Sequence, residues 1–245
     1  IKKKIKFENN LISQNNNLDK SIAYKRYNSF FIDLFEDKLI LTDHLGNAYF
    51  IDQSELFSKK KEQLFAKNIK SNLKATRVFD AYVYKQKIFI SYTLNNDNCN
   101  SINVSYANIN FENLKFEKFY NPKTCNDTGS PGRIQFFSKN EEPGLLLSTS
   151  EGSHDKPGKL TQDKNSIFGK ILFLQLKDGK AQIISLGHRV IQGLYADQNK
   201  IIATEHGPKG GDEINLIFDE KNYGWPVVSL GERYDFKYGK EILSY

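Results

Sequence analysis

The chain of 245 residues contains no methionine and only two cysteines. Cys99 and Cys125 are too few and too far apart for a zinc site of the CxxC kind. Two alternatives remain open for them: a single disulfide formed in an oxidising compartment, or two unpaired buried thiols. Because the chain has no initiator methionine and no charged-then-apolar leader after Ile1, we expect that a precursor segment has been removed.

The sequence also lacks long apolar runs and concentrated charge. No run approaches the roughly eighteen residues that cross a bilayer, so we predict no membrane span. The net charge is +6, but the lysines are scattered and no Arg-rich segment is interleaved with aromatics, so we predict no nucleic-acid partner. No Ser-His-Asp pattern or pair of carboxylates indicates a hydrolase or a lyase.

Short strand-like runs are abundant. Aromatic residues make up 13% of the chain and are set among many Asn, Asp and Gly, which favours strands and tight turns. Runs at 30–35 and 38–42, and at 78–84 and 88–92, are separated by two or three turn residues, which is hairpin spacing. Such pairs recur roughly every 40 to 60 residues, as propeller blades do, although sandwiches and barrels also contain many short strands. Residues 1–27 predict an N-terminal arm or one peripheral strand.

The segment 204–217 changes abruptly from an apolar strand to glycines, a proline and carboxylates. Its three glycines free the backbone and Pro208 fixes φ, so carbonyl oxygens can be held pointing one way. Ca²⁺ binds backbone carbonyls and carboxylates together, and Asp212 and Glu213 follow where they could complete a shell. The alternative interpretation is a Gly-rich hairpin that closes two strands and exposes its acids.

These residues carry a resemblance to a known family. The segment EHGPKGGDEINL at 205–216, followed by NYGWP at 222–226, resembles the signature of the glucose/sorbosone dehydrogenase family, the soluble quinoprotein sugar dehydrogenases. Upstream, FGKIL at 168–172 and GHRVIQGL at 187–194 resemble the family's GKIL and GHRNPQGL in the same order and at similar distances. Residues 1–120 match the family only in strand pattern.

The resemblance implies an all-β fold, a six-bladed β-propeller with the cofactor at the mouth of its central channel. About four blades would be covered by a propeller domain at 28–245 that is incomplete at its C-terminus. It also implies the family's reaction: pyrroloquinoline quinone (PQQ) takes a hydride from the anomeric or aldehyde carbon of a sugar, a histidine removes the hydroxyl proton, and Ca²⁺ polarises the quinone. The expected partners are a sugar and an external electron acceptor, and the expected location is periplasmic or secreted.

The resemblance assigns site residues one by one. The positions that contact the quinone are Arg189, Gln192 and His206. The carbonyls expected to bind the cofactor's Ca²⁺ belong to Gly207 and Pro208. The positions that match a second, structural Ca²⁺ site are Asp212, Glu213 and Tyr223, the last through its carbonyl. Because adjacent carboxylates on a strand point to opposite faces, Glu213 is the better candidate of the two acids.

The sequence departs from the family at three positions. Val190 stands where the family has asparagine, so an amide contact to the cofactor is missing, and Ile191 stands where it has proline. Gly129 falls where the family carries its proton-abstracting histidine, and His154 is the candidate for a recruited base. Two functions therefore remain: a quinone-dependent dehydrogenase with altered catalytic groups, or a catalytically inactive propeller that binds calcium, a carbohydrate or a protein. We adopt the oxidoreductase as the interpretation.

Overall fold

The computed structural model describes the chain in six stretches: residues 4–7, 29–58, 63–96, 99–126, 131–152 and 159–232. Gly129, His154 and most of the predicted arm lie outside them. The described part is all-β, as predicted, and its two helices are short, α1 (Gln53–Phe57) and α2 (Lys159–Gln162). No helix among these stretches is long and apolar enough to cross a membrane.

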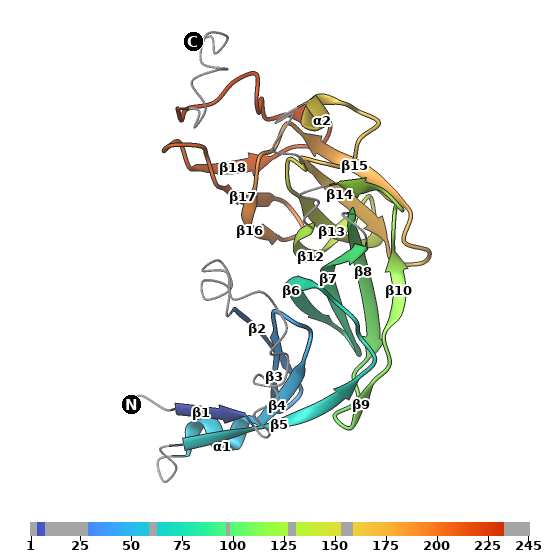
Figure 1. Ribbon diagram of the computed structural model, residues 1–245, viewed down its shortest axis with the longest axis vertical. Coiled ribbons are helices and arrows are strands. Elements are labelled where there is room, and N and C mark those ends of the chain that lie inside the picture. The colour runs from blue at the N-terminus through green and yellow to red at the C-terminus, as the bar shows by residue number, and fades with distance from the viewer. Residues whose placement is uncertain are drawn as a thin grey trace.

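The strands form four sheets that follow one another along a curve (Figure 1). The first sheet contains β1 (Lys4–Phe7), β2 (Phe30–Phe35), β3 (Lys38–Asp43), β4 (Ala48–Asp52), β5 (Gln63–Ser71) and β9 (Asn113–Leu114). The second contains β6 (Arg77–Tyr84), β7 (Lys87–Asn96), β8 (Cys99–Asn108), β10 (Glu117–Tyr120) and β11 (Cys125–Asn126). The predicted hairpins at 30–42 and 78–92 are thus present as β2–β3 and β6–β7.

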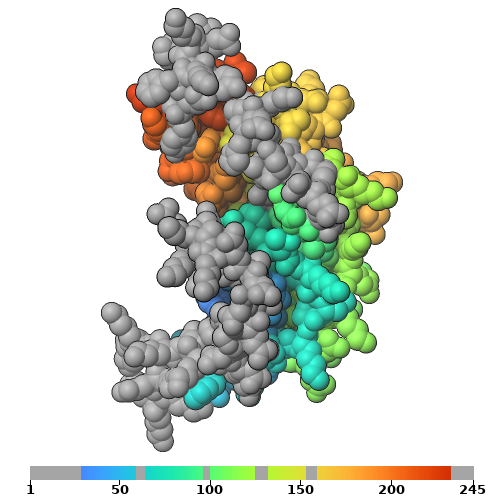
Figure 2. Space-filling view, in the orientation of Figure 1, coloured from blue at the N-terminus to red at the C-terminus, as the bar shows by residue number. Residues whose placement is uncertain are grey.

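The third and fourth sheets carry the sequence motifs. The third contains β12 (Pro131–Lys139), β13 (Glu142–Thr149), β14 (Lys170–Gln175), β15 (Ala181–Leu186) and the parallel strand β19 (Lys221–Asn222). The fourth contains β16 (Ile191–Ala196), β17 (Ile201–Glu205) and β18 (Glu213–Ile217). Figure 2 shows the same succession on the surface, from cyan through green and yellow to orange.

One edge strand of each sheet lies beside an edge strand of the next sheet, in the order β2, β6, β12, β16, and we call these four the first strands. Polar side chains join these first strands to one another. The bonds are Val83 N to Asp33 Oδ2 at 2.6 Å, Ile134 N to Asp80 Oδ2 at 2.9 Å, and Arg133 Nε to the Gln192 carbonyl at 2.7 Å. Contacts advance together along β6 and β12, from Asp80 with Ile134 to Tyr84 with Phe136, so these strands run in the same direction. Arg133 and Gln192 lie near the starts of β12 and β16, so all three strands begin at the same end of the structure.

The core lies between successive sheets. In β13, Leu145 and Leu147 pack in a cluster with Phe89 of the second sheet, whereas Leu146 packs with Ile191 of the fourth. The strand is therefore buried on both faces, which explains its continuous apolar sequence. The sheets at the two ends of the curve, by contrast, expose apolar side chains. Ile32 on β2 and Ile214 on β18 have exposed fractions of 59% and 80%.

The junction between β6 and β12 predicts a pH-dependent stability. Burial raises the pKa of Asp80 to about 6, although the Ile134 N–H and Arg133 act in the opposite direction. The pKa of this carboxyl is higher in the folded state than in the unfolded state. Its contribution to stability is therefore fully present below about pH 4 and is lost as pH rises through about 6. We expect the stability of the wild type relative to Asp80→Ala to fall by about 2 to 3 kcal/mol between pH 4 and pH 7.

Urea unfolding at a series of pH values measures this difference. Asp37→Asn is the control, because it removes an exposed carboxylate and should leave the wild-type pH dependence unchanged. Equal pH slopes for the wild type and Asp80→Ala would contradict the assignment.

Candidate functional site

The glycine-rich loop between β17 and β18 folds back on itself. A side chain on Gly207 would collide with the carbonyl oxygens of Gly210 and Gly211. Gly210 and Gly211 have φ angles of +76° and +69°, in the left-handed region that glycine tolerates. The turn therefore requires glycine at these positions, and it holds the Gly207–Pro208 backbone against the start of β16.

Arg189, immediately before β16, reaches into this loop. Its Nη1 donates to the carbonyls of His206 and Gly207 at 2.9 and 2.8 Å. Its guanidinium carbon lies 5.3 Å from the centre of the Trp225 ring, within cation–π range. Glu151 lies behind both, with Oε1 3.8 Å from Arg189 Nε and Oε2 accepting a 2.8 Å bond from Trp225 Nε1. The arginine side chain, which is only 15% exposed, is thus held in one orientation.

The segment that carries Trp225 is fixed by α2. The Trp225 carbonyl accepts bonds from Thr161 Oγ1 at 2.7 Å and from Gln162 Nε2 at 2.6 Å. The helix is in turn held by the fully buried Lys170, whose Nζ donates to the carbonyls of Leu160, Thr161 and Phe168 at 2.7 to 2.9 Å. Burial lowers the pKa of Lys170 to about 8. The lysine of the FGKIL segment therefore has a structural role that supports the tryptophan.

A buried chain of hydrogen bonds lies beneath Arg189. Ser185 Oγ lies 2.8 Å from His188 Nε2, and His188 Nδ1 lies 2.9 Å from Glu205 Oε2. The other oxygen of Glu205 accepts a bond from the backbone N–H of Arg189. Tyr223 covers the imidazole, with the two rings stacked at 4.8 Å. Glu205 therefore positions both the histidine ring and the arginine backbone.

This Ser–His–Glu order resembles a hydrolytic triad, and sequence reasoning did not find it. Ser185 and His188 are 0% exposed and Glu205 is 6% exposed, so a substrate cannot reach the serine hydroxyl. These buried groups hold the Arg189 backbone in place. Glu205 had one sequence signal, an acid at the end of an apolar strand; Ser185 and Glu151 had none.

His206 and Asp212 form a second pair on the exposed side of the loop. Asp212 Oδ1 accepts a bond from Gly207 N at 2.9 Å and lies 3.2 Å from His206 Nδ1. The His206 side chain is 51% exposed. The carboxylate therefore orients the imidazole while its Nε2 edge stays accessible.

The other predicted residues fall into two groups. Gly207, Pro208, Glu213 and Tyr223 line, with Arg189, a small cavity of about 10 Å³, enough for roughly one water or ion. Gln192 is not part of it, because its side chain is exposed on β16. Asp212 contacts His206 and Gly207 but does not line the cavity. Its side chain is exposed whereas that of Glu213 is half-buried, as expected for neighbouring residues that point to opposite faces of a strand.

The donor set fits a metal only in part. Within the described stretches no group of three or more His, Cys, Asp or Glu side chains is placed to hold an ion. The Gly207 carbonyl already accepts a bond from the positively charged Arg189, and Glu213 accepts one from Asn215 Nδ2 at 3.0 Å. A cation here would use backbone carbonyls and Glu213, beside a guanidinium that opposes it. The same guanidinium suits an acidic quinone.

One departure from the family pattern has a structural explanation. Ile191, at the family's proline position, is 5% exposed and packs in the core between the third and fourth sheets. The carbonyl of Val190, at the asparagine position, accepts the backbone N–H of His206 at 2.8 Å, but this bond does not depend on the side chain at 190. The valine itself has no structural explanation.

The family model of Glucose / Sorbosone dehydrogenase matches residues 30–244. The chain belongs to this family. It is 31% identical over 128 residues to aldose sugar dehydrogenase YliI of Escherichia coli, covering 46% of this chain and 33% of the relative. It is 40% identical over 80 residues to quinoprotein glucose dehydrogenase B of Acinetobacter calcoaceticus, covering 28% of this chain and 17% of the relative. The chain thus spans a third or less of these relatives.

Solved structures share the fold. A glucose dehydrogenase crystal structure superposes with a TM-score of 0.67 at 19% identity, over 84% of this chain and 65% of that one. The soluble aldose sugar dehydrogenase of Escherichia coli in its apo form gives a TM-score of 0.63 at 20% identity, with the same coverage. At 19% and 20% identity these likenesses show that the fold is shared.

The role of Glu205 is testable by stability. In Glu205→Ala both carboxylate oxygens are lost, so the buried Arg189 N–H has no acceptor. A buried donor left unsatisfied costs roughly 1 to 3 kcal/mol, and urea unfolding should show a loss of this size. Glu112→Ala makes the same change at an exposed position and should alter stability by less than about 0.5 kcal/mol. Similar values for the two variants would exclude the positioning role.

Proposed function

We propose that the full-length protein is a PQQ-dependent sugar dehydrogenase that oxidises the anomeric or aldehyde carbon of an aldose and uses Ca²⁺. The observation that carries this proposal is the fixed Arg189 guanidinium, held between Glu151, Trp225 and the carbonyl of Gly207. A half-buried cation in a fixed orientation stabilises an acidic quinone or the charge that develops on its oxygen. The relatives named aldose sugar dehydrogenase and quinoprotein glucose dehydrogenase B support the same chemistry.

The arrangement of the sheets supports a propeller as the frame of the site. In this proposal each of the four sheets is one blade of a six-bladed β-propeller, and the first strands line its channel. Ile32 and Leu34 on β2, and Ile214 and Leu216 on β18, expose apolar side chains at the two ends of the curve. These are the faces against which the neighbouring blades would pack. We further propose a periplasmic or secreted location, which suits a sugar substrate and an external electron acceptor.

In this proposal a bound PQQ supplies the acceptor for the hydride that leaves the sugar carbon. Arg189 holds the quinone through its guanidinium, and His206 lies at its edge. The Gly207 carbonyl keeps one lone pair beside its bond from Arg189, so it and Pro208 can face a cation. Glu213 and the Tyr223 carbonyl are the proposed ligands of a further Ca²⁺, with Asp212 serving to close the loop.

His206 is the proposed base that takes the sugar hydroxyl proton, at Nε2. His188 cannot take it, because both ring nitrogens are engaged and the side chain is fully buried. Asp212 near His206 Nδ1 fixes the tautomer that leaves Nε2 as an acceptor. This pair would replace the histidine that the family carries at the position of Gly129.

Arg189 is tested by direct quinone binding. We expect Arg189→Ala to weaken PQQ binding about 10- to 100-fold, because charge-assisted hydrogen bonds are lost. Absorbance titration of the full-length protein, with and without Ca²⁺, measures this, and Lys180→Ala serves as the control because it removes an exposed charge at the opposite end of the sheets. If the wild type does not bind PQQ at all, the dehydrogenase proposal fails, and a non-catalytic binding propeller becomes the better description.

The base is tested by the rate of dye reduction with aldoses. His206→Gln should lower kcat about 10²- to 10⁴-fold while PQQ affinity stays nearly constant. Gly129→His, which returns the family's imidazole, should raise the rate and recover part of the activity that His206→Gln loses. An unchanged kcat in His206→Gln would show that another group takes the proton.

A further inference from the structure

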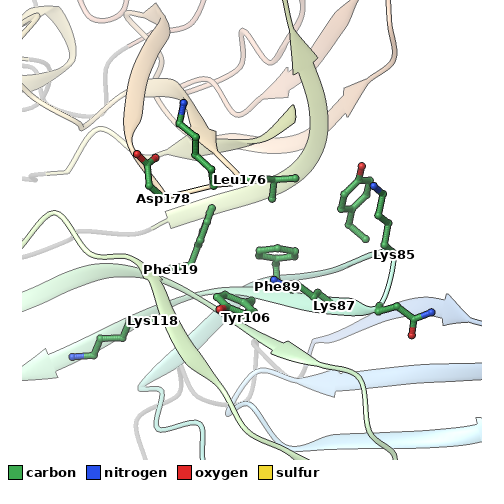
Figure 3. A pocket seen from close by; sticks show the side chains of 11 residues that line it. Lys85, Lys87, Phe89, Tyr106, Lys118, Phe119, Leu176 and Asp178 are labelled. Carbon is green, nitrogen blue, oxygen red and sulfur yellow. The ribbon is translucent and has the colours of Figure 1, made fainter. Parts of the chain in front are cut away.

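A groove of about 540 Å³ lies between the second and third sheets, away from the Arg189 site. It is lined by the β6–β7 turn, by strands β7, β8 and β10, and by the turn after β14 (Figure 3). Arg189 precedes the start of β16, whereas Lys85 and Gln86 follow the end of β6, and these first strands begin at the same end of the structure. The groove is therefore at the opposite end of the sheets from Arg189. Its volume is that of a small-molecule site.

The floor and walls of the groove are aromatic. Phe89 is buried at the base, and its ring meets that of Phe119 edge-on at 5.5 Å. Tyr106 and Phe119 are half-buried, with their rings 6.2 Å apart at 85°. Figure 3 shows Leu176, from the third sheet, across from the Phe89 ring. A flat apolar group can thus lie between the two sheets.

The groove is formed by tight contacts between the sheets. Gly179, in the turn after β14, has φ of +69°, and a side chain there would collide with the Phe119 carbonyl. On the other wall, Tyr84 stacks on Phe136 with ring centres 4.0 Å apart and planes at 9°. Both walls are therefore fixed without a ligand, which lowers the entropy cost of binding one.

The rim carries an excess of positive charge, with four lysines against one aspartate. Lys177 is paired with Glu142 at 2.8 Å, and Asp178 is paired with Lys180 at 3.5 Å. Lys85 and Lys87 instead lie over the rings of Tyr84 and Tyr106, at 5.3 and 4.2 Å from the ring centres. Neither of these two makes an ion pair with an acid of the described stretches. The half-buried Lys87 in particular would gain from a bound anion.

We propose that this groove binds a small organic anion with a flat apolar body, an aromatic carboxylate. The ring system lies against Phe119 and Tyr106, and the carboxylate faces Lys87 and Lys85. A neutral ligand of the same shape fits less well, because it has no charge to pair with Lys87 and Lys85. The site is independent of the dehydrogenase chemistry proposed above.

Calorimetric titration of the full-length protein with 2-naphthoate tests this proposal, and 2-naphthalenemethanol is the neutral probe of the same shape. We expect saturable 1:1 binding of naphthoate that weakens with added salt, and binding of the alcohol that is at least several-fold weaker. Lys87→Met should weaken naphthoate binding about 5- to 10-fold, the effect of one charge-assisted contact, without affecting the alcohol. Lys74→Met removes an exposed lysine outside the groove and should change neither.

Two further variants place the ligand. Leu176 is half-buried at the rim, so the larger side chain of Leu176→Trp should fill the groove and abolish binding of both probes. Circular dichroism checks that this variant folds. Arg189→Ala should leave naphthoate binding unchanged, which separates this groove from the proposed quinone site. Equal affinities for naphthoate and the alcohol, equal effects of Lys87→Met and Lys74→Met, or no saturable binding would each overturn the proposal.

Discussion

The candidate site depends on one buried carboxylate. Glu205 accepts the backbone N–H of Arg189 with one oxygen and His188 with the other, and it is nearly inaccessible to water. A carboxylate can satisfy both donors because both of its oxygens are acceptors, whereas an amide has only one. The orientation of Arg189 toward the Gly207 carbonyl follows from this, and Trp225 then covers the guanidinium.

The sheets give this carboxylate a rigid support. Strands β13 and β14 are buried on both faces, so the third sheet is packed against both of its neighbours and cannot shift alone. Asp33, Asp80 and Arg133 bind the backbone of the next first strand, which aligns the strand starts at one end. The two ends of the sheets consequently differ in chemistry: loops with carbonyls and a fixed cation at one, and aromatic turns with lysines at the other.

The departures from the family pattern change the chemistry more than the scaffold. Ile191 fills the core where the family has proline, and Val190 keeps a backbone bond to His206, so the fold around Arg189 is complete without the asparagine side chain. The histidine expected at Gly129 has no counterpart in the sequence, yet the His206–Asp212 pair lies on the accessible side of the same loop. In the function proposed above, the frame of the site is retained while the proton-transfer group differs.

The sequence by itself determined the local features: the hairpins of β2–β3 and β6–β7, the glycine loop after β17 and the ordered motifs that identify the family. These depend on neighbouring residues and on backbone conformations that few side chains allow. Only the tertiary structure decided that Glu151 and Trp225 meet at Arg189, and that Phe119 and Leu176 line one groove. The residues of each set are separated by tens of positions, and they come together only because each sheet buries its apolar face against the next.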